Sequence, residues 1–311
     1  MNRLLIGVCL GLCVAPVAAF GHDSPEHVIE DLSIAMQRRG RSPELLYRRA
    51  TEYRVLGRLD RAAEDLQAAL ELSPDYLVAQ LELGRVHLAL GDPDKARIAV
   101  ERAEPLAKEP HERALVHMTR CELHLTTGKP EEALRECQQA CRLHPGEVEW
   151  LLQRSQLQAD LGRHGARIRD LQAARKQNPS VVLQIELIEA WIDAGQFEEA
   201  LPQIESELAD SRWRSSWLLR RARILQRTGK DVAAASDLRA AIEEIDARLH
   251  PARPDAGLLV DRGTARAMLG DLDAARADLD AARARGADAW TRRPLERLLA
   301  GITATSSSTS R

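Results

Sequence analysis

Seven glycines recur along the 311-residue chain at a nearly constant interval, and this period constrains the fold more than any other feature. The successive separations are 34, 37, 34, 33, 34 and 41 residues. A fixed period of this length is typical of an array in which one supersecondary unit is repeated and stacked. Such arrays form extended curved surfaces that bind partners. The glycines are Gly57, Gly91, Gly128, Gly162, Gly195, Gly229 and Gly270.

Small residues flank the glycines at fixed distances. The fifth residue after the glycine is alanine in six of the seven copies, and the seventh residue before it is mostly small, as in Ala50 and Gly84. The ninth residue after it is usually large and apolar, as in Leu66. Spacings of three and four place such positions on one face of a helix. Each copy is therefore predicted to be a pair of close-packed helices joined at a glycine with left-handed backbone.

The first copy carries the full pattern as Leu46, Ala50, Tyr53, Gly57, Ala62, Leu66, Ala69 and Pro74. This pattern resembles the tetratricopeptide repeat family, and the resemblance extends over residues 43–289. It implies an all-α fold, an α-α solenoid with a right-handed superhelix of about seven helical hairpins and a capping helix at each end. Arg167 and Glu207 stand where the family has alanine, so looser packing is expected in those two repeats.

The N-terminal residues 1–21 are typical of a secretory signal peptide. A short apolar run from Leu4 to Val14 is followed by small residues, and cleavage after Ala19 or after Gly21 fits the pattern. The run is too short for a membrane-spanning anchor. The sequence therefore predicts an exported, soluble protein that is periplasmic or secreted.

Both ends of the array are predicted to be covered by helices, because terminal repeats would otherwise expose an apolar face. Residues 22–42 are expected to hold the N-terminal capping helix and residues 290–302 the C-terminal one. Residues 303–311 are rich in serine and threonine and are expected to be disordered.

Charge and motif content exclude several classes of function. The chain has 44 Lys and Arg against 47 Asp and Glu, for a net charge of -3, so it lacks the basic footprint of a nucleic-acid-binding protein. It contains no P-loop, nucleotide-binding glycine cluster, serine elbow or HExxH motif. We therefore predict no catalytic residues and no cofactor.

Five of the seven copies also share an arginine eight residues before the glycine and a carboxylate eight residues after it. The two copies that lack the arginine also lack the carboxylate. We expect an ion pair between the two helices of each such hairpin, in the bidentate geometry available to arginine. The predicted pairs are Arg49–Asp65, Arg120–Glu136, Arg154–Asp170, Arg221–Asp237 and Arg262–Asp278.

In the family that the chain resembles, the first helix of each hairpin lines a concave groove along which peptide partners usually lie. The positions that the resemblance assigns to this groove mix apolar residues with arginines near the N-terminal end. The lysines and asparagines that form the carboxylate clamp of chaperone-binding relatives are missing, so the resemblance implies an extended partner with apolar anchors and an acidic end. The positions are Tyr47, Thr51, Arg54, Leu81, Arg85, Leu88, Met118, Glu122, Leu125, Leu152, Gln156, Ile185, Glu189, Leu219 and Arg223.

Two sets of residues have the character of metal ligands. His117, Cys121 and His124 are spaced four and three apart on one helical face, which suits zinc or copper, but they occupy inward motif positions that favour core packing. His22 would be the first residue after cleavage at Gly21 and could bind copper through its amine and its ring, with His27 as a further ligand. The simpler interpretation, which we favour, is that these are polar residues at the start of the capping helix and bind no metal.

Three cysteines follow the signal peptide, and all belong to the third repeat. Cys121, Cys137 and Cys141 occupy positions that hold small or apolar residues elsewhere, so they are expected to act as small buried hydrophobes. A disulfide between Cys121 and Cys137 stays an open alternative in an oxidising compartment.

These features predict a secreted or periplasmic protein that mediates protein-protein interaction, as a scaffold or an envelope assembly adaptor, by binding a partner along the groove. The alternative is a copper-binding envelope protein that uses the mature N-terminal His22.

Overall fold

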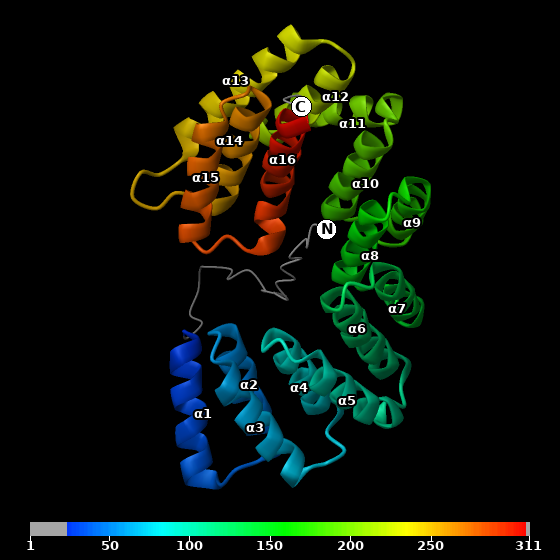
Figure 1. The fold of residues 1–311 in the computed structure, drawn as a ribbon, viewed down its shortest axis with the longest axis vertical. Coiled ribbons are helices and arrows are strands. Elements are labelled where there is room, and N and C mark those ends of the chain that lie inside the picture. Colours follow the sequence, from blue (N-terminus) through cyan, green and yellow to red (C-terminus); the bar gives the residue numbers. More distant parts are fainter. Residues whose placement is uncertain (1–23, 309–311) are drawn as a thin grey trace. The chain divides into compact units, whose positions relative to one another are not determined.

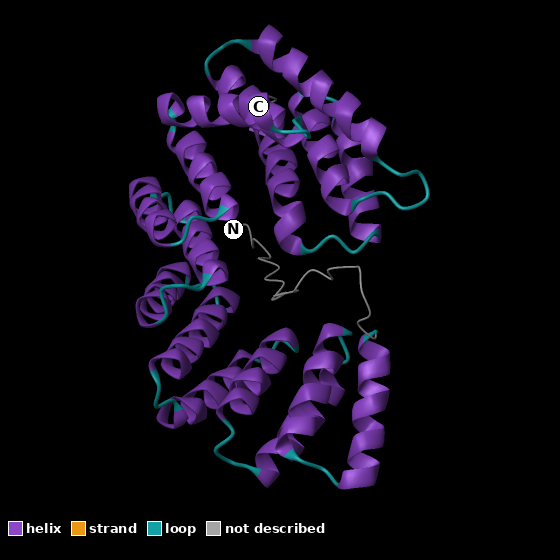
Figure 2. Cartoon of the chain, turned by 180° about the vertical axis from the view of Figure 1, so that it is seen from behind, coloured by secondary structure: helices purple, strands orange, loops and turns teal. Residues whose placement is uncertain are grey.

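All regular structure in the described part of the chain is helical. The computed structural model describes residues 24–308, which contain sixteen α-helices, one short 3₁₀ helix and no strand (Figures 1 and 2). The elements are α1 (Pro25–Arg39), α2 (Pro43–Val55), α3 (Leu59–Leu72), α4 (Leu77–Ala89), α5 (Pro93–Ala103), η1 (Glu104–Leu106), α6 (Pro110–Thr126), α7 (Pro130–Leu143), α8 (Val148–Asp160), α9 (His164–Gln177), α10 (Val181–Ala194), α11 (Phe197–Asp210), α12 (Ser215–Arg227), α13 (Asp231–Arg248), α14 (Ala256–Met268), α15 (Leu272–Ala284) and α16 (Ala289–Ser308).

Consecutive helices pack as seven hairpins, from α2 with α3 to α14 with α15. Helix α1 packs on α2, and α16 packs on α14 and α15, so the first and last hairpins are both covered by an additional helix. The all-α hairpin array predicted from the glycine period is confirmed.

The chain divides into two compact units between Asn178 and Pro179. The first unit contains α1 to α9, hence four hairpins, and the second contains α10 to α16, hence three hairpins and the last helix. None of the seven glycines marks this division, because it falls in the connection between two repeats.

The seven repeat glycines all have left-handed backbone, with φ between 67° and 88°. At the first of them, Gly57 N donates to Arg54 O at 2.9 Å and Arg58 N donates to Tyr53 O at 2.8 Å. These two bonds satisfy carbonyls at the end of α2 that have no partner within the helix. The bonds therefore end the first helix and turn the chain toward the second within two residues.

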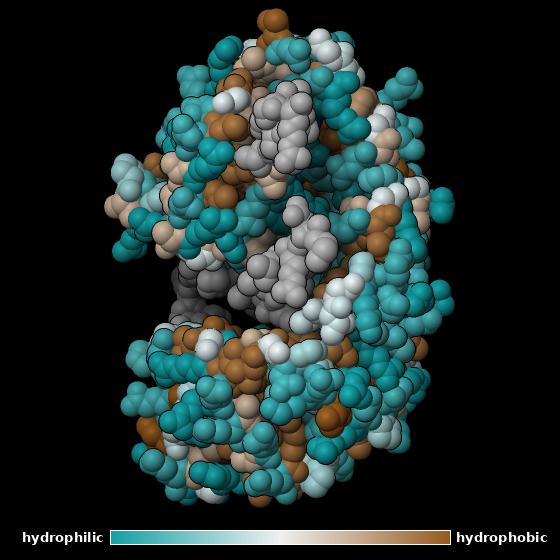
Figure 3. Space-filling model, viewed as in Figure 1, coloured by the Kyte–Doolittle hydropathy of each residue, from teal (hydrophilic) through white to brown (hydrophobic). Residues whose placement is uncertain are grey.

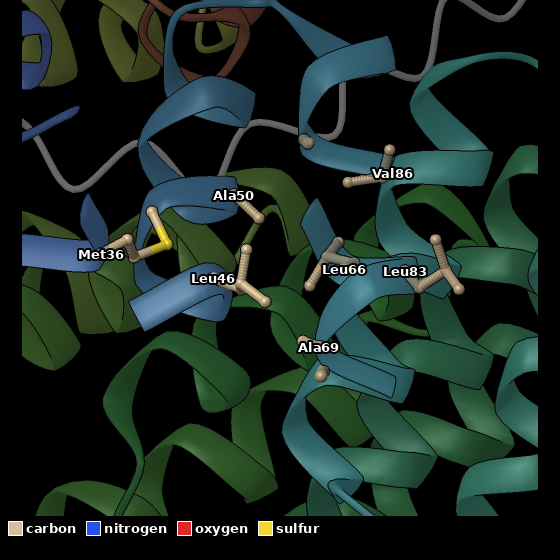
Figure 4. Packing of buried hydrophobic residues seen from close by; sticks show 9 residues of the cluster. Met36, Leu46, Ala50, Leu66, Ala69, Leu83 and Val86 are labelled. Carbon is tan, nitrogen blue, oxygen red and sulfur yellow. The ribbon is translucent and has the colours of Figure 1, made fainter. Parts of the chain in front are cut away.

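Small residues let the two helices of a hairpin approach closely. In the first hairpin Ala50, Ala62 and Ala69 are fully buried, with Leu66 between them. Burying a leucine of this kind contributes about 2 kcal/mol to folding. The same cluster joins α1 to α4, as the labelled side chains of Figure 4 show: Met36, Leu46, Ala50, Leu66, Ala69, Leu83 and Val86.

Four of the five predicted arginine–carboxylate pairs are confirmed. Three are bidentate, as at Arg49, whose Nε and Nη2 each donate to a different oxygen of Asp65 at 2.7 Å. Arg154 approaches Asp170 through Nε alone, at 3.3 Å. The other two bidentate pairs are Arg221–Asp237 and Arg262–Asp278.

The fifth predicted pair, Arg120 with Glu136, is wrong. Arg120 pairs with Glu104 instead, and Glu136 is hydrogen-bonded to His117 Nδ1 at 2.7 Å. Glu104 belongs to η1, in the longer connection that precedes the third repeat, so it offers Arg120 a different carboxylate. Burial by itself would raise the pKa of Glu136, but the hydrogen bond with His117 and the nearby charges leave it lowered.

The ends of the array differ in part from expectation. The N-terminal helix begins at Pro25, with the Ser24 side chain accepting a hydrogen bond from His27 N, inside the expected range of 22–42. Helix α16 continues to Ser308, six residues beyond the expected end at residue 302. The predicted signal peptide, residues 1–21, lies outside the described residues.

One carboxylate of the second unit is half-buried and has no direct ion pair among the described residues. Asp261 on α14 lies near Arg220 and Arg248, but its burial, together with the Asp255 and Glu189 carboxylates, outweighs the two cations and raises its pKa to about 6. The folded state therefore binds a proton at this site more tightly than the unfolded chain does.

The glycine turns allow a matched test. Replacing Gly162, whose φ is +67° and whose Cβ would meet no atom within 4 Å, isolates the backbone cost. We expect Gly162→Ala to lower the free energy of unfolding by about 1 kcal/mol. Gly165 lies within α9, where alanine is favoured, so Gly165→Ala should raise it by about 0.5 kcal/mol. Urea denaturation measures both, and equal effects would contradict a left-handed turn at Gly162.

The raised pKa of Asp261 predicts a pH dependence. Between about pH 4 and 6 the folded state still holds a proton on Asp261 that the unfolded chain has already lost. The free energy of unfolding therefore declines as the pH rises through this window. Asp261→Asn should therefore stabilise the second unit at pH 8 by about 1 to 3 kcal/mol, and the gain should vanish below pH 4.

Unfolding can be followed by fluorescence, because Trp191, Trp213 and Trp217 belong to this unit. Asp280→Asn on the exposed face of α15 is the control and should show no such window. A gain for Asp261→Asn that is independent of pH would contradict the raised pKa.

Candidate protein-binding surface

The residues assigned to the groove come from the first helix of successive hairpins. In the first unit they lie on α2, α4, α6 and α8, and in the second on α10 and α12. Five of the fifteen are buried: Leu81, Leu88, Met118, Glu122 and Leu219. The other ten keep part of their surface exposed.

The buried apolar members belong to the core. Leu81 packs in a cluster with Val100 and Val116, and Leu88 packs with Ala96 and Leu123. Met118, with 1% of its surface exposed, is equally inaccessible. The prediction that these residues are apolar anchors for a partner is therefore wrong, because their side chains fill the contact between neighbouring helices.

The charged members form a chain of ion pairs that connects the first three repeats. Arg54 on α2 donates to Glu82 on α4 through Nε. Arg85, also on α4, lies 3.4 Å from Glu82 and donates from Nε to Glu122 on α6 at 3.2 Å. Both glutamates are nearly inaccessible, with 2% and 3% of their surface exposed. The arginines therefore neutralise carboxylates that would be costly to bury alone.

The electrostatics of Arg85 follow from this arrangement. Burial alone would lower its pKa, but the Glu122 and Glu82 carboxylates leave it raised, so the guanidinium stays charged. Burial and the nearby Glu82 also raise the pKa of Tyr47, whose ring makes an edge contact with Tyr76 at 5.7 Å between centroids. The prediction that Arg54 and Arg85 receive the acidic end of a partner is not supported by these contacts, because both guanidinium groups already have carboxylate partners.

The second unit has an equivalent arrangement. Arg223 on α12 pairs with Glu189 and with Asp193, the latter at 3.1 Å, and Arg220 approaches Glu189 at 2.8 Å. Carboxylates on α10 thus join arginines on α12, the first helix of the next hairpin. The raised pKa of Arg223 is caused chiefly by Glu189.

Six of the ten partly exposed groove positions are uncharged. In the first unit these are Tyr47, Thr51, Leu125, Leu152 and Gln156, and in the second unit Ile185. Large exposed apolar side chains elsewhere are scattered, and Figure 3 shows one face on which hydrophilic residues predominate and hydrophobic ones form small separate areas. No helix among the described residues combines the length and apolar character needed to cross a membrane.

The cysteines of the third repeat are buried free thiols. The contact with Cys121 and burial raise the pKa of Cys137, and its sulfur lies 3.5 Å from the backbone oxygen of Trp150. Contact with Cys137 likewise raises the pKa of Cys141. A protonated buried thiol is unreactive, which agrees with the interpretation of these residues as core.

The predicted set of His117, Cys121 and His124 is not assembled in residues 24–308. His117 is held by Glu136 rather than turned toward Cys121 and His124, and no group of three or more histidine, cysteine or acidic side chains within the described residues is arranged to hold a metal. His27 is exposed at the start of α1. His22 lies outside the described residues.

The comparisons with known proteins agree with the hairpin geometry. A sequence model described as tetratricopeptide repeat matches residues 56–120. A tetratricopeptide repeat and J domain-containing co-chaperone of Fusarium oxysporum f. sp. lycopersici is 32% identical over 130 residues, which cover 34% of this chain and 24% of the relative. The match thus spans about a quarter of that relative's length.

Solved structures are similar to the chain as well. A tetratricopeptide repeat protein from Parabacteroides merdae ATCC 43184 superimposes with a TM-score of 0.56 at 19% identity, covering 88% of this chain and 99% of that one, and so has the same fold. A thermophilic tetratricopeptide repeat protein of Thermus thermophilus reaches a TM-score of 0.47 at 21% identity over 54% of this chain and 91% of its own. The glycine period, the paired helices, the sequence matches and the fold shared with the Parabacteroides protein together support a protein of the tetratricopeptide repeat family.

Proposed function

We propose that this protein is an exported scaffold that binds a polypeptide partner along the first helices of its hairpins. A tetratricopeptide repeat fold supports a role in protein-protein interaction. The observation that carries the more specific proposal is the pairing of charges along these helices. Because Arg54 and Arg85 are paired with glutamates, their charges are balanced, and the uncharged groove positions such as Leu125, Leu152 and Gln156 are left to contact a partner.

The partner that fits such a surface differs from the one implied by sequence alone. Tyr47 offers an aromatic ring and a hydroxyl group, and Leu125 and Leu152 offer apolar contact. Gln156 and Thr51 can donate and accept hydrogen bonds. The proposed ligand is therefore an uncharged, partly apolar segment, bound through side-chain packing and amide hydrogen bonds rather than through an acidic terminus.

Export is supported by the composition of residues 1–21, with a short apolar run followed by small residues. An extracytoplasmic scaffold would meet its partners in the periplasm or outside the cell. The three buried thiols are compatible with that setting because they are inaccessible to oxidants.

Site-specific photo-crosslinking in the producing organism tests the proposal. A photoreactive residue placed at Leu152 or Gln156 should give discrete crosslinked partners, recovered from the envelope or secreted fraction with a protein that begins at Phe20 or His22. The same residue at Val232, which is 89% exposed on a second helix, is the matched control and should give none. Crosslinks of equal strength at Val232, or none at Leu152 and Gln156, would contradict the binding surface. Recovery of the uncleaved chain from the cytosol would contradict export.

A further inference from the structure

Two tyrosines form an aromatic pair at the N-terminal end of the groove. Tyr47 lies on α2, and Tyr76 directly precedes α4, the first helix of the next hairpin. Their ring centroids are 5.7 Å apart and their planes are inclined by 65°. Both side chains are half-buried and pack against the core cluster that joins α1 to α4. The core therefore fixes the two rings as a corner, and the exposed part of each ring can contact a partner.

The hydroxyl groups of this pair are unused hydrogen-bond donors. Neither the Tyr47 nor the Tyr76 hydroxyl is hydrogen-bonded to another described residue. Burial is the chief cause of the raised pKa of both, so each hydroxyl keeps its proton. A phenol in this state donates readily to a carbonyl oxygen. The pair thus offers aromatic surface and two donors at one place.

Other common ways of binding a peptide lack their requirements at this end of the groove. No strand is present in residues 24–308, so a peptide strand has no sheet edge to join there. An amphipathic helix would need apolar anchor sites, but Leu81, Leu88 and Met118 are buried in the core. An acidic segment would need free cations, but Arg54 and Arg85 are paired with glutamates. An extended segment without acidic residues is the ligand that these contacts leave.

The exposed charges beside the pair agree with such a ligand. Glu44 lies close enough to Tyr76 to raise its pKa, Asp75 precedes Tyr76 in the chain, and Arg48 follows Tyr47. All three are exposed, and none forms an ion pair within the described part of the chain. Two carboxylates against one guanidinium leave a weak negative potential. This potential tolerates an uncharged or weakly basic segment and disfavours an acidic one.

A proline-rich segment meets these conditions. It adopts the extended polyproline II conformation without internal hydrogen bonds, so its carbonyl oxygens are free to accept from the two tyrosine hydroxyls. Proline has no N–H, so burying such a segment against the rings leaves no amide donor without a partner. Because the segment is already extended before it binds, little conformational entropy is lost.

We propose that the pair of Tyr47 and Tyr76 binds a proline-rich segment of the partner in the polyproline II conformation. One proline ring packs into the corner between the two tyrosine rings, and the tyrosine hydroxyls donate to carbonyl oxygens of the segment. The proposal rests on the protein-binding role proposed above and specifies the chemistry of the partner at the N-terminal end of the groove.

Fluorine NMR of the folded protein, with an oligoproline peptide as the probe, tests the proposal. The chain contains three tyrosines, so fluorotyrosine labelling gives three tyrosine signals, and single substitutions by phenylalanine assign them. Oligoproline should shift the signals of Tyr47 and Tyr76. The signal of Tyr53 should stay in place, because its ring is occupied by Arg49, whose Cζ lies 5.7 Å from the ring centroid. A peptide of equal length made of alanine and serine should shift none of them.

The dissociation constant for oligoproline separates the ring from the hydroxyl group. Tyr47→Ala, which removes the ring, should weaken binding by about tenfold or more. Tyr76→Phe keeps the ring and loses one hydrogen bond, so it should weaken binding by about threefold to tenfold. Tyr53→Phe is the matched control and should leave binding unchanged. Thermal unfolding of each variant establishes that it folds as the unmodified protein does.

Several results would overturn the proposal: tyrosine signals that oligoproline leaves unchanged, equal binding of the alanine and serine peptide, or equal affinity in Tyr47→Ala and Tyr53→Phe. The photo-crosslinks at Leu152 and Gln156 lie on α8 and do not depend on either ring. Crosslinks that persist while oligoproline fails to bind would therefore contradict this site and leave the proposed function standing.

Discussion

The first unit depends on the neutralisation of two buried glutamates by arginines. Glu82 and Glu122 occupy first helices where hardly any water reaches them, and a carboxylate in such a place is costly unless a cation accompanies it. Arg54 and Arg85 supply those cations from the same and the neighbouring repeat. The pairing fixes the register of successive hairpins and at the same time removes the arginines from the set of groups that could bind an anionic partner.

Within each hairpin the close approach of two helices depends on small residues. A Cβ on Gly84 would lie 3.5 Å from Ala96 O and 3.6 Å from Ala99 Cβ, at ordinary van der Waals contact. Larger side chains at this position would separate the helices. The arginine–carboxylate pairs across four hairpins then add directional bonds to a contact that is otherwise set by shape.

The period of the glycines predicted the fold well because it reports local geometry. A glycine with positive φ between two helical segments turns the chain within two residues, and this holds even after Gly162, where Arg167 replaces the alanine. The partner of Arg120 could not be predicted in the same way, since Glu104 belongs to a connection outside the repeat pattern.

The sequence also did not predict which side chains of the first helices are buried. Leu81 and Met118 match groove positions of the family, yet both are covered by adjoining helices.

On the first helices, arginines and glutamates of successive repeats neutralise one another. A double-mutant cycle on Arg85→Met and Glu122→Met, measured by urea unfolding, tests this most directly. A coupling energy of about 1 to 3 kcal/mol that persists at high salt is predicted, because the pair joins two hairpins in a poorly hydrated position. Additive effects, with a coupling below about 0.5 kcal/mol, would contradict the account.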